Sequence, residues 1–98
     1  MSYKFESKVW LYPGEQGAWH FVSVPKQLSE KLGKKYQGLH RGWRSLPVLV
    51  RVGKSKWRTS VFFDRRNNCY ILPIKASIRK KEGIYEDDNL DLSIRIEL

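Results

Sequence analysis

The sequence predicts a mainly β domain with two short helices, closed into a barrel of two similar halves. Both ends of the chain alternate between apolar and polar residues, which is typical of half-buried antiparallel strands. Two proline–glycine pairs, Pro25 with Gly33 and Pro73 with Gly83, bracket short segments of helical spacing. A chain of 98 residues buries one core but not two, so we expect a single domain over residues 1–98.

The strands are expected where apolar runs lie between turn signals. Alternation is clearest from Leu90 to Leu98, and in the first strand Ser7 interrupts the apolar face. Gly53 lies in a short turn, so the strands on either side of it are expected to form a hairpin. The six expected strands cover residues 3–11, 18–24, 46–52, 57–63, 69–72 and 90–98.

The first helix is expected over residues 26–32 and a second, slightly longer one over residues 74–81. Proline suits the start of a helix because the amide that it lacks has no partner there. Gly33 and Gly83 are placed to end the two helices in a left-handed conformation. Because strand, proline, helix and glycine recur in this order, we expect two similar half-barrels, each end plugged by a helix.

Several segments resemble a bacterial family called domain of unknown function nineteen-oh-five: SVPKQLSEKLG, RVGKSKW, TSVFF and above all YILPIKASIRKKEGI. The likeness runs from Tyr3 to Leu98 and implies a six-stranded, double-split β-barrel, distantly similar in fold to AbrB-type and MazE-type domains. One departure is the turn Glu86–Asn89, where the family pattern has Gly-Asp. The resemblance implies no activity, because likeness of fold to DNA-binding domains does not transfer their function.

Charge is distributed unevenly along the chain. Lys and Arg number 19 against 10 Asp and Glu, a formal net charge of +9. No acidic residue lies between Lys31 and Phe63, whereas acidic residues predominate after Lys81. A segment of one sign attracts polyanions, although many domains are basic for solubility alone.

The basic middle segment leads us to expect a non-enzymatic module that binds DNA or RNA without sequence preference. Trp43 lies in a Gly- and Arg-rich loop and is a candidate to stack on a base, whereas Trp57 is either a core residue or a second stacking platform. The expected nucleic-acid-binding residues are Arg41, Trp43, Arg44, Arg51, Lys54, Lys56, Trp57 and Arg58.

An alternative is a module that binds a small anion or a protein through the second helix. Lys75 and Arg79 are four residues apart, so they share a helix face on which two cations repel each other. An anion would relieve that repulsion. The two side chains could instead pair with Glu82, Asp87 or Asp88, or bond carbonyl groups at the helix end.

Catalysis has little support, and we expect no catalytic residue, metal ion or cofactor. His20 and His40 have no metal-ligand spacing with Cys69, which is expected to be a packing residue. The single cysteine and the absence of a signal-peptide pattern or long apolar run favour a cytoplasmic protein without a membrane partner. We expect a monomer or a weak dimer.

Overall fold

The computed structural model describes residues 2–12 and 19–98, apart from the side chain of Trp43. Its strands are β1 (Ser2–Lys8), β2 (Trp10–Tyr12), β3 (Trp19–Ser23), β4 (Ser45–Val52), β5 (Ser55–Asp64), β6 (Cys69–Pro73) and β7 (Asn89–Ile96). The helices are α1 (Lys26–Lys35), the 3₁₀ helix η1 (Gly42–Arg44) and α2 (Ala76–Glu82). The mainly β class with two short α-helices is therefore confirmed.

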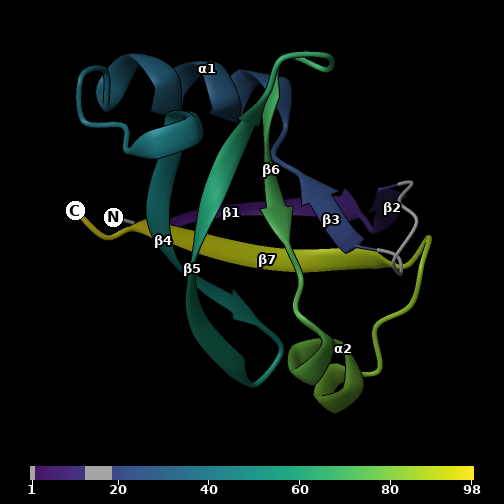
Figure 1. Ribbon diagram of the computed structural model, residues 1–98. Coiled ribbons are helices and arrows are strands. Elements are labelled where there is room, and N and C mark those ends of the chain that lie inside the picture. The colour runs from purple at the N-terminus through teal and green to yellow at the C-terminus, as the bar shows by residue number, and fades with distance from the viewer. Residues whose placement is uncertain (1, 13–18) are drawn as a thin grey trace.

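The strands form one curled antiparallel sheet in the order β1-β7-β4-β5-β6-β3-β2 (Figure 1). Seven strands replace the expected six because the first strand is interrupted at Val9. The Val9 amide donates to the Asp88 carbonyl and its carbonyl accepts from the Asp87 amide, each at 2.9 Å. The chain thereby passes from one edge of the sheet to the other.

Polar contacts also join the two edges of the sheet near Val9. The Ser7 hydroxyl donates to the Ser23 carbonyl at 2.7 Å, and Trp10 Nε1 donates to the Ser23 hydroxyl at 3.0 Å. Ser7, which breaks the apolar alternation of β1, therefore links β1 to β3. This link explains the polar residue on the inward side of the strand.

The two α-helices lie at opposite ends of the curled sheet (Figure 1). Leu32 of α1 and Ile78 of α2 point into the core, where their side chains are buried. The outward neighbours of the core residues are polar on most strands, as expected for a half-buried sheet. The expectation of a helix at each end is confirmed.

The helix boundaries correct two details. α1 continues past Gly33 to Lys35, because the Tyr36 amide still donates to the Leu32 carbonyl, at 3.0 Å. α2 is shorter than α1, with seven residues against ten. It begins late because the Ile74 amide donates to the His20 carbonyl at 2.8 Å, which prolongs the ladder between β3 and β6.

Gly83 ends α2 as expected, with φ 65° in the left-handed region. Its amide donates to the Arg79 carbonyl, and the next residue, Ile84, is buried in the core. None of the helices within residues 2–12 and 19–98 is long and apolar enough to span a membrane.

Candidate nucleic-acid interface

Basic side chains gather on the outer face of β7, β4 and β5. Residues directly opposite each other in paired strands project from the same face of a sheet. Four of the residues in these rows, Arg51, Lys56, Arg58 and Arg95, are exposed. Two outward rows cross β7, β4 and β5 in that order. The first consists of Ser93, Arg51 and Lys56, and the second, beside the first, consists of Arg95, Leu49 and Arg58.

A hollow of about 180 Å³ lies between these rows, and we call it the cationic hollow. Among the residues that the structure describes, three cations and two hydroxyl side chains line it, and no carboxylate does. It is large enough to receive a phosphate group, with donors from several strands around it. The lining residues are Ser2, Leu49, Arg51, Lys56, Ser93, Ile94 and Arg95.

Arg51 and Lys56 are direct cross-strand partners. Like charges in that position destabilise a sheet. No ion pair is found for either side chain among the residues that the structure describes. An anion in the cationic hollow would therefore relieve a repulsion for which the described residues provide no ion pair.

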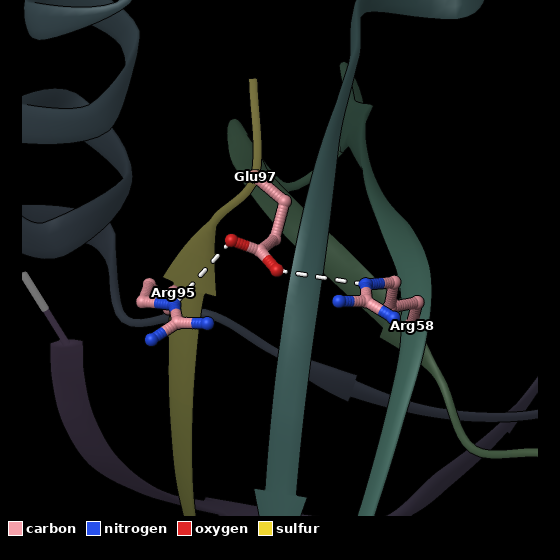
Figure 2. Close-up of polar contacts among 3 residues, drawn as sticks. All are labelled: Arg58, Arg95 and Glu97. Carbon is pink, nitrogen blue, oxygen red and sulfur yellow. Dashed lines mark ion pairs between the residues drawn. The ribbon is translucent and has the colours of Figure 1, made fainter.

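Glu97 lies between Arg95 of β7 and Arg58 of β5, across β4 (Figure 2). Its carboxylate is 3.4 Å from Arg95 Nε and 3.5 Å from Arg58 Nε. The Arg58 side chain is 77% exposed, so these pairs are screened by solvent and contribute little to stability. Their effect is to reduce the positive charge at one side of the cationic hollow.

Acidic residues limit the positive surface on its other side. Glu6 of β1 is directly opposite Asp91 of β7, and both line a second hollow of about 490 Å³ together with Lys4 and Arg51. This second hollow has mixed charge. Lys4 of β1 is opposite Ser93 and continues the row of Arg51 and Lys56, and Lys54 is exposed in the adjoining turn.

The expected binding residues separate into two groups. Arg51, Lys54, Lys56 and Arg58 lie on or beside β4 and β5, as the hairpin predicts. Arg41 and Arg44 flank or belong to η1, at the end of β4 near α1. Extended chain from Arg44 to Arg51 spans roughly 23 Å, so the two groups do not form one cluster.

Trp57, one of the two candidate tryptophans, is a core residue. Trp57 is 6% exposed and packs in the core opposite Val50. It presents no free ring face to a base, so its inclusion among the binding residues was wrong and the core alternative holds. Successive side chains of a strand point to opposite faces of the sheet, so the Trp57 side chain points inward between the outward-pointing Lys56 and Arg58. The Trp43 side chain lies outside the part of the chain that is described.

Lys75 and Arg79 are not arranged on one helix face as expected. Lys75 precedes α2 in an extended conformation and is exposed. Arg79 is half-buried, and its Nε donates to the Ile74 carbonyl at 3.2 Å. Glu82 accepts a hydrogen bond from Ser55 instead of pairing with either cation. An anion site at these two residues stays a prediction.

An aromatic cluster lies on the outside of β2 and β3, with Tyr12 and Trp19 exposed. Trp19 is 64% exposed and its ring is stacked with Phe21 at 6.2 Å, beside Trp10 and Tyr12. Arg66 lies 5.6 Å above the Tyr12 ring. Period-two alternation of aromatic residues along both strands was the signal that could have identified it.

Cys69, the one cysteine considered for catalysis or metal binding, has a structural position. Cys69 is buried, and burial raises the pKa of its thiol, with a weaker opposing effect from the Ser23 hydroxyl. A thiol with a raised pKa is a poor nucleophile at neutral pH. No group of three or more His, Cys, Asp and Glu residues that could hold a metal ion is found in the described residues.

A family model matches residues 5–94, and its description is Domain of unknown function (DUF1905). No curated protein matches the chain.

Proposed function

Because the chain belongs to that family, whose description assigns no activity, we propose its function from its surface: a non-enzymatic module that binds nucleic acid without sequence preference. Phosphates would lie along the outer face of β7, β4 and β5. Bases would contribute little, because no exposed aromatic residue among those described lines the cationic hollow.

The observation that carries this proposal is the cationic hollow. Arg51 and Lys56 are opposite each other without a carboxylate between them, and Arg95 completes the lining. Charge-assisted hydrogen bonds from guanidinium and ammonium groups are the usual way in which proteins hold phosphate oxygens. The Ser2 and Ser93 hydroxyls add neutral donors at the same place.

Further cations extend the surface on both sides of the cationic hollow. Lys54 lies in the turn between β4 and β5, and Arg58 lies in the neighbouring row. Neighbouring phosphates of one strand would therefore meet successive cations. Arg41 and Arg44 are left out of this surface, because of their distance along β4. The expected cytoplasmic location belongs to the same proposal, because nucleic acid is an abundant polyanion there.

The test is fluorescence anisotropy with a labelled DNA duplex and a labelled single strand at about 50 mM salt, where the Debye length is roughly 14 Å. The double variant Arg51→Gln, Lys56→Gln should weaken binding by about tenfold or more. It should also reduce the slope of log affinity against log salt by about 2 for duplex DNA, because two counterions fewer are released.

A matched control is Lys80→Gln, Lys81→Gln, which removes the same charge from exposed positions in α2. Its loss of affinity should be small, because only long-range attraction changes. The proposal fails if neither nucleic acid binds to the wild-type protein at this salt concentration. It also fails if the two double variants lose affinity equally.

A further inference from the structure

A separate pocket of about 540 Å³ opens at the end of the curled sheet that α1 covers. Its walls come from α1, from the connection that follows α1, and from β5 and β6. This volume lies within the range of small-ligand sites, roughly 300–1,000 Å³. The cationic hollow and this pocket share no lining residue.

The pocket contains a paired histidine and tyrosine. His40 Nε2 lies 2.5 Å from the Tyr70 hydroxyl, and the two rings are within 6° of parallel with centroids 5.9 Å apart. Burial lowers the pKa of His40, with a smaller effect from the Arg44 charge, and burial raises the pKa of Tyr70. Both groups are therefore neutral at neutral pH. Their hydrogen-bonding atoms form one polar position among the aromatic rings that line the pocket.

Arg44 places a cation in the same pocket. Its guanidinium carbon lies 4.2 Å from the centroid of the Phe63 ring, which leaves the N–H edge of the group free to form hydrogen bonds. No carboxylate pairs with Arg44 among the described residues. Lys34 from α1 is a second cation in the lining, against one acid, Glu30.

The backbone at Arg44 has an unusual conformation. Its φ is 49°, in the left-handed region that residues other than glycine rarely adopt. Two hydrogen bonds between the backbones of Arg41 and Ser45, of 2.8 and 3.3 Å, close the turn that holds it there. Strained residues of this kind are concentrated at binding sites, where they fix a side chain in place.

We infer that this pocket binds a small planar organic anion, an aromatic or heteroaromatic ring that carries a carboxylate or phosphate. The anionic group contacts the Arg44 guanidinium, whose planar fork of N–H donors suits two oxygens of a carboxylate or phosphate. The ring lies against the half-buried His40 imidazole. A polar ring substituent reaches His40, which the Tyr70 hydroxyl holds in place.

Gly33 gives this inference an independent test, because it lines the pocket from α1. A methyl group at this position would lie 3.7 Å from the Tyr70 hydroxyl oxygen, which is ordinary van der Waals contact. Gly33→Ala therefore fits the folded protein, and it favours the helix because alanine is a better helix former than glycine. The same methyl group takes space from a ligand beside Tyr70.

The probes are benzoate and phenyl phosphate, with benzyl alcohol as the uncharged control. In ¹⁵N–¹H NMR titrations we expect saturable shifts at the amides of Gly33, Asn68 and Tyr70 with at least one anion, and none at the distant Gly53. The two anions distinguish a carboxylate site from a phosphate site. Benzyl alcohol should not give saturable shifts.

Arg44→Gln should weaken the anion by about ten- to a hundredfold, because it removes a charge-assisted bidentate contact. Arg41→Gln, an exposed neighbour outside the pocket, should leave the affinity within about twofold. Gly33→Ala should weaken binding although it does not lower the stability of the protein. The inference is overturned if neither anion gives saturable shifts, if benzyl alcohol binds as well, if Gly33→Ala leaves the affinity unchanged, or if Arg41→Gln has as large an effect as Arg44→Gln.

Discussion

The Tyr70 hydroxyl and His40 Nε2 lie 2.5 Å apart, and this contact attaches the connection after α1 to the start of β6. Tyr70 is fully buried, so its hydroxyl needs a partner inside the protein. On the main chain, the Tyr70 amide donates to the Ser29 hydroxyl at 3.0 Å, and its carbonyl accepts from the Val24 amide at 2.8 Å. One residue of β6 thus holds both ends of α1 in place.

The first prediction concerns the pH dependence of stability. Because the pKa of His40 is lowered by burial and by Arg44, the unfolded chain takes up a proton at about pH 6.5, before the folded protein does. The free energy of unfolding should therefore fall as the pH is lowered below about 6.5, until the pH passes the pKa of the folded state. Lys34 and Glu30 also line the pocket that contains His40, and they are unchanged in the His40→Gln variant that serves as the comparison.

The measurement is urea denaturation of the wild type and of His40→Gln at pH 7 and at pH 5. Each protein gives one difference in unfolding free energy between the two pH values. The wild type should lose more stability than His40→Gln over this interval. Equal losses would mean that His40 titrates alike in the folded and unfolded states.

The second prediction concerns Glu97, which neutralises part of the proposed nucleic-acid surface. Glu97→Gln should strengthen binding of the DNA duplex by about two- to fivefold at low salt, because Arg58 and Arg95 are then free for phosphates. Unfolding free energy should change by less than about 0.5 kcal/mol, because exposed ion pairs contribute little. Fluorescence anisotropy and urea denaturation give the two values.

Glu86→Gln provides a matched control for Glu97→Gln, since it removes one negative charge from an exposed turn. It should change affinity less than Glu97→Gln does. If both variants increase affinity equally, only the net charge of the protein matters, and the position of Glu97 has no special effect.

The third prediction concerns α1, which closes one end of the barrel. Leu32 is fully buried whereas Leu28, one turn earlier, is only half-buried. Leu32→Ala should lower the unfolding free energy by about 2–5 kcal/mol, because it leaves a cavity in the core. Leu28→Ala should cost about 1 kcal/mol. Urea midpoints at constant m-value measure both, and equal costs would contradict the deeper burial of Leu32 on the face that the two leucines share.

The fourth prediction concerns the end of α2. Gly83 has φ 65°, so a side chain there is strained, although nothing lies within 4 Å of the added Cβ. Gly83→Ala should cost about 1–2 kcal/mol. Gly42→Ala is the control, because Gly42 has equally open surroundings and no positive φ. It should be neutral within about 0.5 kcal/mol by thermal or urea unfolding, and an equal cost at both sites would exclude backbone strain as the reason.

Local pattern was sufficient for most of the fold. The alternation from Leu90 predicted β7 within about two residues of its observed ends, because a half-buried strand requires side chains of period two. The hairpin around Gly53 and the end of α2 at Gly83 were likewise predicted correctly. Each of these features depends on residues close together in the chain.

Contacts between distant segments explain where that pattern failed. The break at Val9 depends on backbone bonds to Asp87 and Asp88, which no pattern in the first strand reveals. The late start of α2 depends on the bond from Ile74 to His20. The polar Ser7 on the inward side of β1 has its partner, Ser23, sixteen residues later in β3.

The candidate functional residues also divide into those that local sequence predicted and those that only contacts between distant segments bring together. Composition identified the basic segment, and the hairpin placed Arg51 beside Lys56 because the turn sets their register. Arg95 was missed, since only the pairing of β4 with β7 brings it to the cationic hollow. His40 and Tyr70 were missed as a pair for the same reason.

Residue types and short spacings were enough to predict most strands, the two helices and the excess of positive charge. Which charges are neighbours, that Glu97 neutralises two of them, and that Trp57 faces the core became clear from the folded protein. Electrostatic attraction and burial depend on distances in space, which spacing along the chain does not give. In a curled sheet, strand register brings together residues that lie far apart along the chain.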